Sequence, residues 1–454
     1  MVRKFIDRED ELKALRERLS SRNFELIIVY GRRRIGKTRL VLESLKNSTY
    51  IYYLAVESGN LRKFKEAATK IVPEVKYAAD DWEAILHFLK NRIIVLDEFP
   101  NLIKEDKGIL SLLQRVVDLE FSKTRSKLIL LGSSVSMMES KVLSYKSPLY
   151  GRRTSTLRLK PLRFHCLTEF FPEASLEELI EIYGFADGIP FYLERVKYPF
   201  WKWLDRELKR PDSFVRYEID FLMKYEFEDT ATYKRILEAV AFGKTKLGEI
   251  KDYIGARRSD ITPYLRNLTE AGFITREVPI TEPPKSRKGR YHIKDNFTCF
   301  WFRFIYPNLS AIEQGIFNVD EIKGEYNQYL GHVFEKVATQ FMVDLAKAGK
   351  IRPFSRLGRW WRKNVEIDLV ALNTKEQEAM FVEVKWAELT PIDVRRIFRE
   401  LEKKAVNVEW NFNERREYYC IIARKIDRKK ELREKYDENF FLFDLDDFKD
   451  LAYK

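Results

Sequence analysis

Cysteine and histidine are scarce in this sequence. Its 454 residues include four histidines and three cysteines, Cys166, Cys299 and Cys420, which stand far apart. Isolated cysteines cannot form a disulfide framework, and neither residue type has the paired spacing of a zinc site. We therefore set aside both a disulfide-stabilised fold and a zinc centre.

Long hydrophobic runs are also missing. The longest, such as residues 26–30 and 128–131, fall far short of the roughly 20 residues that cross a bilayer. Residues 1–15 alternate charged and apolar side chains and have no continuous apolar core of a signal peptide. We expect no membrane span and a cytoplasmic location.

Acidic residues are outnumbered by basic ones. The chain has 83 Lys and Arg against 70 Asp and Glu, a formal net charge of +13, which favours a polyanionic partner.

Hydrophobic residues make up 45%, enough for packed cores. At roughly 150 residues per domain, the length predicts about three domains.

The first third of the chain alternates strand and helix patterns. Residues 24–30 are a nearly continuous apolar run that ends at Gly31, as expected of a parallel strand buried on both faces. Further strands are expected at 49–56, 92–96 and 127–131, and helices at 7–19, 80–89 and 109–119. This alternation predicts a doubly wound α/β domain that ends near Pro161.

The middle of the chain is mostly helical. A helical pattern covers 168–227, and 233–307 has the order helix, helix, helix, hairpin. In the second part, helices at 246–254 and 259–271 precede strands at 272–274 and 291–293, which enclose a basic, Pro-rich stretch at 282–290. We interpret this part as a winged helix-turn-helix.

The last part of the chain has the pattern of a second α/β unit. Its expected elements are helices at 331–346 and 391–405 and strands at 365–372, 379–386 and 417–423. The change from helices to mixed helices and strands predicts a separate domain after Asn308.

A phosphate-binding loop follows the first strand. The segment Gly31, Arg32, Arg33, Arg34, Ile35, Gly36, Lys37, Thr38 fits G-x-x-x-x-G-K-[ST] and leads into a helical segment near Arg39. The glycines let backbone N–H groups surround the β-phosphate of ATP or ADP at a helix N-terminus. Lys37 is expected to reach the β- and γ-oxygens, and Thr38 to ligate Mg²⁺. The three arginines either contact a phosphate-bearing partner or are solvated.

A matching acidic pair ends a later strand. Asp97 and Glu98 follow the apolar run 93–96, which places one carboxylate beside the metal and the other toward the γ-phosphate. We expect Asp97 to hold Mg²⁺ through water and Glu98 to polarise the attacking water. Either motif alone could be an ordinary turn or a solvated acidic pair, but together they predict an ATPase.

With these motifs the chain resembles the AAA+ superfamily, close to STAND-like archaeal ATPases that carry a PD-(D/E)XK-like C-terminal domain. The resemblance covers residues 5 to about 193. It implies that Ser133 or Ser134 is a sensor of the γ-phosphate and that residues 5–9 pack beside the adenine. It also implies that Gly188-Ile189-Pro190 forms a lid over the nucleotide.

An arginine pair, Arg152 and Arg153, follows this sensor position. A guanidinium is always charged and offers a planar fork to phosphoryl oxygens, so either residue could be an arginine finger. Surface solvation is the alternative. A finger could act in cis or on a neighbouring subunit, which leaves a homo-oligomer open.

Basic side chains crowd the expected winged helix. They are Arg257, Arg258 and Arg266 near the second helix and Lys285, Arg287, Lys288 and Arg290 in the wing. Such a footprint favours contacts with the phosphates of nucleic acid, DNA in the first place, with little reading of sequence. In the resembling ATPases, however, a winged helix often packs on its own ATPase core.

The tail contains a D…E-x-K pattern. Glu383 and Lys385 lie on one face of a strand, and Asp368 is expected on a neighbouring strand. Carboxylates suit Mg²⁺, and Lys385 could orient the hydrolytic water or stabilise developing charge. Glu335, in a preceding helix, is expected to add a metal ligand. Two amphipathic strands with outward charges are the alternative.

The order of these elements resembles the PD-(D/E)XK nuclease fold over residues 331–424. The proline that precedes the aspartate in that family is absent, since Glu366-Ile367 stands there, so nuclease activity is left open. The predicted domains are therefore an ATPase core at 1–165, a helical lid at 166–228, the winged helix-turn-helix at 229–307 and the nuclease-like domain at 308–454.

These features predict an Mg²⁺-dependent ATPase that acts on or near DNA through its winged helix and nuclease-like domain. A second hypothesis is a nucleotide-dependent regulatory switch whose tail recruits proteins and cuts nothing. A third is a transcription regulator gated by nucleotide.

Overall fold

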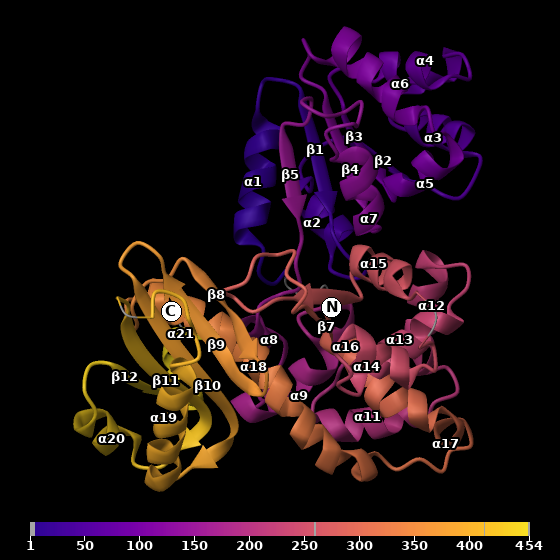
Figure 1. Cartoon of the computed structure of the whole chain (residues 1–454). Coiled ribbons are helices and arrows are strands. Elements are labelled where there is room, and N and C mark those ends of the chain that lie inside the picture. Colours follow the sequence, from indigo (N-terminus) through magenta and orange to yellow (C-terminus); the bar gives the residue numbers. More distant parts are fainter. Residues whose placement is uncertain (1–4, 258–259, 413, 453–454) are drawn as a thin grey trace. The chain divides into compact units, whose positions relative to one another are not determined.

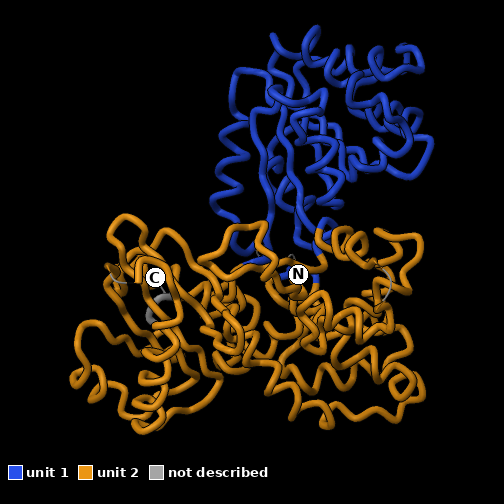
Figure 2. Tube along the Cα trace, in the orientation of Figure 1, with its two compact units in different colours: residues 1–162, 189–191, 270–272 blue, residues 163–188, 192–269, 273–454 orange. Residues whose placement is uncertain are grey.

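The computed structural model describes residues 5–257, 260–412 and 414–452. It divides into two compact units (Figure 2). Unit 1 comprises Met1–Leu162, Ile189–Phe191 and Glu270–Gly272, and unit 2 comprises the rest of the chain. The four-domain division of the sequence stays a prediction.

Unit 1 is built on a parallel five-stranded sheet with the strand order β2-β3-β4-β1-β5 (Figure 1). The strands are β1 Glu25–Tyr30, β2 Tyr50–Leu54, β3 Ile93–Asp97, β4 Lys127–Gly132 and β5 Ser155–Arg158. The α/β class and the first four strands are confirmed. β5 was not predicted, because it is a short edge strand whose residues alternate between half-buried and exposed.

Both faces of this sheet are covered, as the apolar strand β1 requires. Its alternate residues enter two hydrophobic clusters, Leu26 and Ile28 on one face and Ile27 and Val29 on the other. The second cluster holds α1 and α2, and the first holds α3 to α6. The helices of unit 1 are α1 Glu9–Ser20, α2 Lys37–Ser44, α3 Asn60–Thr69, α4 Trp82–Phe88, α5 Phe99–Glu105, α6 Ile109–Val116 and α7 Val135–Met137.

The first part of unit 2 is helical around an aromatic core. The Phe185 ring meets those of Trp203, Phe297 and Phe300 edge to face, with centroids 5.0–5.4 Å apart. The helices are α8 Leu167–Phe170, α9 Leu176–Ala186, α11 Phe200–Lys209, α12 Phe214–Glu226, α13 Ala231–Ala241, α14 Leu247–Tyr253, α15 Thr262–Glu270, α16 Asn296–Phe300 and α17 Leu309–Glu313, while α10 Pro190–Leu193 spans a unit boundary.

Three helices and an antiparallel hairpin follow one another from α13 onward. The hairpin joins β6 (Ile274–Glu277) and β7 (Arg290–Ile293). This is the order of elements that the sequence predicts for 233–307. Helix α15 begins at Thr262, three residues later than expected; Arg258 and Ser259 lie outside the described residues.

The end of unit 2 is a mixed five-stranded sheet with the order β12-β11-β10-β9-β8. β8, β9 and β10 are antiparallel, whereas β10, β11 and β12 are parallel. The strands are β8 Arg356–Arg362, β9 Val365–Asn373, β10 Glu378–Leu389, β11 Arg416–Ile426 and β12 Phe440–Phe443. The separate C-terminal sheet domain is confirmed, but the edge strands β8 and β12 were missed.

Helices cover this second sheet on both faces. Val394, Phe398 and Leu401 of α19 (Pro391–Ala405) pack into the core on one side. On the other, Phe334 of α18 (Lys323–Lys347) lies 5.2 Å from the Trp386 ring, and Phe341 stacks on Phe448 of α21 (Leu445–Ala452). A short helix, α20 (Lys429–Lys435), completes the domain.

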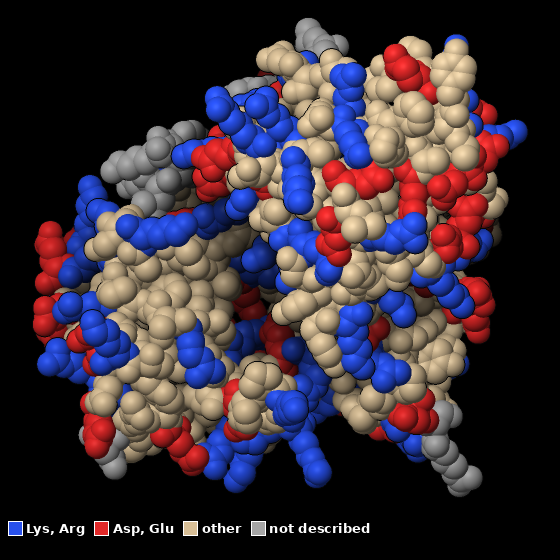
Figure 3. Space-filling model, turned by 90° about the horizontal axis from the view of Figure 1, so that it is seen from above, with Lys and Arg blue, Asp and Glu red and all other residues tan. Residues whose placement is uncertain are grey.

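Two further observations concern membrane-spanning helices and the charged side chains of the surface. Across the described ranges of the chain, no helix is both long and apolar enough to span a membrane. Figure 3 shows Lys and Arg side chains lying among Asp and Glu side chains on the face in view.

Candidate functional site

The loop between β1 and α2 is built around two glycines. Gly31 has φ +150°, and a Cβ there would lie 2.6 Å from both Ile35 Cδ1 and the Leu159 carbonyl oxygen, so a side chain does not fit. Gly36 has φ +88°, in the region that glycine adopts at least cost. The buried Lys37 donates a hydrogen bond from Nζ to the Arg32 carbonyl at 2.9 Å. The loop is therefore wrapped around its own lysine, immediately before the N-terminus of α2.

The segment that carries Pro190 lies against this loop. The backbone N–H of Phe191 donates to the Arg34 carbonyl at 3.4 Å, and the Arg34 guanidinium lies 3.6 Å from the centre of the Phe191 ring. Pro190 Cγ is 4.0 Å from the position a Cβ on Gly36 would take. The structure thus brings Pro190 to the loop. Arg34 stacks on an aromatic ring, while Arg32 and Arg33 are half-buried in the same turn.

Asp97 lies beside Thr38 at the carboxyl ends of the strands. Thr38 Oγ1 donates to Asp97 Oδ2 at 2.6 Å, although the two residues are 59 positions apart. Asp97 is 3% exposed. Its other oxygen, Oδ1, accepts the backbone N–H of Glu98 at 2.8 Å. A hydroxyl oxygen and a carboxylate oxygen this close together are ligands that suit a magnesium ion.

Tyr52 is a member of this cluster that the sequence did not reveal. Its hydroxyl donates to Asp97 Oδ2 at 2.9 Å from the neighbouring strand β2. Burial, with the nearby Asp97 carboxylate, raises the pKa of Tyr52, so the phenol stays protonated and remains a donor. A tyrosine within a strand of aromatic residues carries no motif, and no signal in the sequence could have singled it out.

Glu98 lies next to Ser133, which follows β4. Ser133 Oγ donates to Glu98 Oε1 at 2.6 Å, whereas Ser134 Oγ lies 3.3 Å from Ser136 Oγ. Of the two sensor candidates, the structure therefore brings Ser133 to the carboxylate. Glu98 Oε2 is buried and makes no hydrogen bond within the described chain, and Glu98 has φ +49°. A strained residue with a buried open acceptor is typical of a reacting group.

The arginine pair is engaged elsewhere in unit 1. Arg152 makes a two-pronged ion pair with Asp118, with distances of 2.7 and 2.8 Å, and this hydrogen bonding lowers the pKa of Asp118. Arg153 donates to the Leu143 carbonyl at 3.1 Å. The structure does not bring the pair to Glu98.

Arg39, at the start of α2, lies 5.8 Å from the Phe5 ring centre, which places residue 5 beside the helix that follows the loop.

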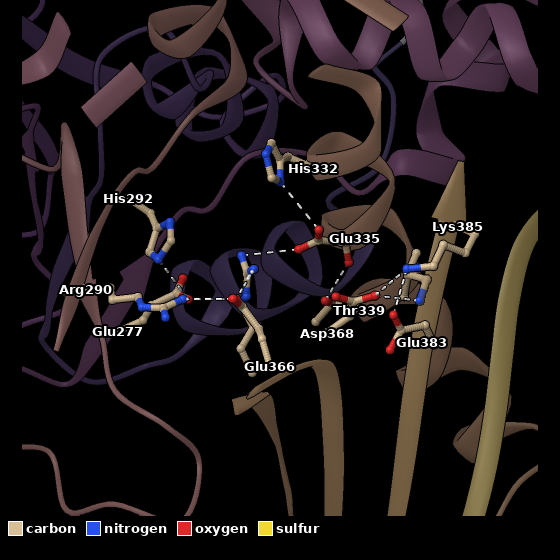
Figure 4. Close-up of polar contacts among 12 residues, drawn as sticks. Glu277, Arg290, His292, His332, Glu335, Thr339, Glu366, Asp368, Glu383 and Lys385 are labelled. Carbon is tan, nitrogen blue, oxygen red and sulfur yellow. Dashed lines mark hydrogen bonds and ion pairs between the residues drawn. The ribbon is translucent and has the colours of Figure 1, made fainter. Parts of the chain in front are cut away.

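A second cluster lies in the C-terminal domain (Figure 4). Asp368 comes from β9 and Glu383 and Lys385 from β10, and the two strands are antiparallel neighbours. Asp368 Oδ2 accepts the backbone N–H of Val384 at 2.8 Å, and Lys385 Nζ donates to Glu383 Oε1 at 2.7 Å. The predicted constellation is thus brought together. Burial, with the charges of Glu383 and Glu335, raises the pKa of Asp368 to about 7.

Lys404 of α19 belongs to the same cluster and was missed. Its Nζ lies 3.1 and 3.0 Å from the two oxygens of Glu383. The helix that carries it was predicted, but its packing over β10 was not. Glu383 is therefore held by two lysines, Lys385 and Lys404.

Glu335 of α18 opens a chain of charges toward the hairpin (Figure 4). It pairs with Arg359 at 3.2 Å, Arg359 with Glu366 at 3.0 Å, and Glu366 with Arg290 of β7 at 3.1 Å. Burial alone would raise the pKa of Glu335, but its hydrogen bond with His332 and the charge of Arg359 outweigh burial and lower it. Arg290 of the wing is therefore committed to the C-terminal sheet.

The carboxylates of this second cluster already have cations of the chain as partners. Among the residues that the structure describes, no group of three or more His, Cys, Asp and Glu is arranged to hold a metal ion. Glu383 contacts two lysines and Glu335 contacts Arg359. A metal ion at Glu335, Asp368 and Glu383 stays a prediction.

Other basic residues of the expected winged helix are partly neutralised. Arg257 pairs with Asp252 at 2.8 Å and Lys288 with Glu282 at 2.5 Å. Arg290 also lies 4.6 Å from the Trp361 ring centre. Lys285 and Arg287 are exposed, whereas Arg258 lies outside the described residues.

The chain is similar to known proteins. Residues 5–196 match an ATPase domain predominantly from Archaea, and residues 301–397 match archaeal and bacterial proteins of unknown function. An uncharacterized ATP-binding protein, MJ0423, of Methanocaldococcus jannaschii is 44% identical over 43 residues, 10% of this chain and 73% of that protein. The Walker-type ATPase PABY2304 of Pyrococcus abyssi has a similar fold, with a TM-score of 0.51 and 21% identity over 66% of this chain and 96% of that one.

One relative matches almost the whole chain and shows to which family the chain belongs. The uncharacterized protein MJECL04 of Methanocaldococcus jannaschii is 59% identical over 445 residues, 98% of this chain and all of that protein. The chain therefore belongs to the family of this M. jannaschii protein and carries an archaeal-type P-loop ATPase domain, followed by a C-terminal domain of unknown function.

Proposed function

We propose that the protein is an Mg²⁺-dependent ATPase that acts on or near DNA. One observation carries the ATPase activity: the ends of β1, β3 and β4 bring Thr38 to Asp97 and Ser133 to Glu98, both at 2.6 Å. These residues come from three segments that were predicted separately. The ATP-binding relative MJ0423 supports the same conclusion.

Each residue has a task in this proposal. The backbone of the loop and Lys37 would bind the β- and γ-phosphates, and Pro190 would close over the nucleotide from the adjoining segment. Thr38 and Asp97 would hold the magnesium ion, which when bound neutralises charge on the phosphate oxygens. Glu98 would orient and polarise the attacking water, with Ser133 fixing the Glu98 carboxylate.

The arginine finger belongs to the same proposal. Arg152 or Arg153 would stabilise the charge that develops on the γ-phosphate. Because Arg152 is bound to Asp118, that pair would have to open before Arg152 acts, whether in cis or on a neighbouring subunit of a homo-oligomer. The chain would then be an AAA+ enzyme of the STAND-like type.

We propose a PD-(D/E)XK nuclease-like fold for the C-terminal domain. The order α18, β8, β9, β10, α19, β11 and the contacts among Asp368, Glu383 and Lys385 support it. DNA would reach this domain from the winged helix formed by α13–α15 and β6–β7. Lys285 and Arg287, both exposed in the wing, would contact phosphates, since Arg290 is held by Glu366.

A regulatory switch without cleavage is the second candidate. It is favoured by the two lysines on Glu383 and by the pairing of Glu335 with Arg359, because carboxylates neutralised in this way have less charge to offer a metal ion. In that case the domain would bind a partner and ATP would set its conformation. A transcription regulator is a special case, and a selection from random duplexes that enriches one site would identify it.

One experiment separates these candidates. Labelled single- and double-stranded DNA is incubated with the protein, with and without ATP and with Mg²⁺ or Mn²⁺, beside the Lys37→Ala and Glu383→Ala variants. Cleavage that Glu383→Ala abolishes supports the nuclease. ATP hydrolysis with no cleavage under any condition supports the switch, and absence of ATP hydrolysis by the wild type contradicts both.

A further inference from the structure

Tyr52 reaches Asp97 from the edge strand of the first sheet. In the parallel pairing of β2 and β3, Tyr52 lies opposite Val95 and Leu54 opposite Asp97. Residues two apart in a strand share a face, so Tyr52 and Asp97 project on the same side of the sheet. Asp97 lies two residues beyond Val95, the residue opposite Tyr52. The long phenol side chain spans this diagonal and brings its hydroxyl to 2.9 Å from Asp97 Oδ2.

Three hydrogen-bond donors hold the Asp97 carboxylate. Oδ2 accepts from Thr38 and from Tyr52, and Oδ1 accepts from the backbone of Glu98. The carboxylate is almost fully buried, and three donors compensate the cost of burying its charge. Its plane is fixed by contacts from α2, from β2 and from the backbone of the next residue.

Tyr52 differs from Thr38 in what it can do when a metal ion arrives. The Thr38 hydroxyl would offer a lone pair to the cation, and its own orientation would then depend on the ion. The backbone of Tyr52 is held in β2, and its hydroxyl reaches the carboxylate from that strand. It can hold Oδ2 in place both before and after the metal ion binds.

We propose that Tyr52 is a positioning residue for the magnesium–nucleotide complex, acting through Asp97. The inference rests on the proposed ATPase activity and assigns to β2 a part in the metal site. Outer partners of metal-binding groups fix the orientation of those groups, and their removal typically weakens metal binding by about 10- to 100-fold.

The next residue provides a matched control. Tyr53 also donates from its hydroxyl to a buried acceptor, Asn60 Oδ1, at 2.7 Å, but it lies on the other face of β2. Tyr53→Phe therefore removes the same atom from the same strand without touching Asp97. A purely structural loss of one tyrosine hydroxyl would affect both variants alike.

The test titrates a fluorescent ATP analogue into the full chain, first in EDTA and then with increasing Mg²⁺. Tyr52→Phe should bind the nucleotide in EDTA as the wild type does. It should need roughly 10-fold more Mg²⁺ to reach half of the fluorescence change that Mg²⁺ produces. Tyr53→Phe should have the Mg²⁺ dependence of the wild type. Tyr52→Leu, which also lacks the hydroxyl, should show at least the same shift, and thermal unfolding checks that each variant is folded.

Two results would overturn the inference. One is an unchanged Mg²⁺ dependence in Tyr52→Phe, and the other is an equal shift in Tyr53→Phe. Neither would touch the proposed ATPase activity, because the wild type in the same titration shows whether the nucleotide binds at all.

Discussion

The hydroxyl of Ser133 donates a hydrogen bond to the carboxylate of Glu98 at 2.6 Å, and the two residues follow neighbouring parallel strands, β4 and β3. The bond leaves Glu98 Oε2 without a hydrogen-bond partner in the described chain. Ser133 thus orients one oxygen of Glu98, and the other, although buried, has an unused acceptor that the proposed activation of a water molecule would use.

Replacing Ser133 by alanine should slow ATP hydrolysis and leave ATP binding unchanged. A lost hydrogen bond to a charged group costs about 1.5–3 kcal/mol, which corresponds to a roughly 10- to 100-fold lower kcat. Ser134→Ala is the control, because Ser134 lies beside Ser136 and not beside Glu98. Steady-state hydrolysis and nucleotide titration measure the two effects. Equal kcat values for the two variants would contradict the role of Ser133.

Replacing Glu98 by glutamine should trap the nucleotide. The amide keeps the size of the side chain but cannot accept a proton, so hydrolysis should fall by about 10²–10⁴-fold. Binding of ATP should persist because Lys37, Thr38 and Asp97 are intact. A single-turnover assay measures the rate of ATP hydrolysis. A variant rate within about threefold of the wild-type rate, which is roughly the error of such an assay, would show that Glu98 is not the base.

Replacing Lys404 by alanine should destabilise the C-terminal domain. Among the described residues, the change leaves Glu383, which is 7% exposed, with Lys385 as its remaining cation. We expect a loss of roughly 1–3 kcal/mol in the free energy of unfolding. Lys403→Ala is the matched control, since this neighbour is exposed and should change stability by less than about 0.5 kcal/mol. Urea unfolding compares the variants, and equal midpoints would refute the structural importance of the second lysine.

Replacing Gly184 by alanine should strain the helical core of unit 2. A Cβ at this position of α9 would lie 2.6 Å from the Tyr326 hydroxyl oxygen and 3.0 Å from Leu330 Cδ2, both on α18. Overpacking of this kind costs about 1–3 kcal/mol. In Gly331→Ala the Cβ meets no atom within 4 Å, and the variant should gain up to about 1 kcal/mol, because alanine favours the helix. Thermal unfolding shows the difference, and a Gly184→Ala variant as stable as the wild type would disprove the close contact.

The sequence predicted those parts of the site that lie within one short segment. The loop 31–38, the pair Asp97 and Glu98, and the Glu383-x-Lys385 pattern each combine residues that are neighbours in the chain, so their spacing carries the chemistry. Tyr52 and Lys404 were missed because each reaches its carboxylate from another element, and pairing register and helix packing decide those contacts. The choice between Ser133 and Ser134 likewise needed the backbone.

The same distinction holds for the fold. Buried strands such as β1 and β4 are continuous apolar runs and were predicted, whereas β5 and β8 lie at sheet edges and mix polar with apolar residues. The ion pairs of Arg290 and Arg152 were not foreseen either, because their acidic partners, Glu366 and Asp118, lie 76 and 34 residues away. A basic cluster in the sequence does not show which of its charges the fold consumes.

The most direct test is isothermal titration calorimetry of the intact protein with ATP and Mg²⁺, beside the Lys37→Ala variant. The wild type should take up ATP at a single site per chain, and Lys37→Ala should bind at least 10-fold more weakly, by about the 1.4 kcal/mol or more that a lost charged contact costs. Folded wild-type protein that takes up no ATP, or a Lys37→Ala variant that binds ATP equally well, would contradict the assignment of this loop as the nucleotide site.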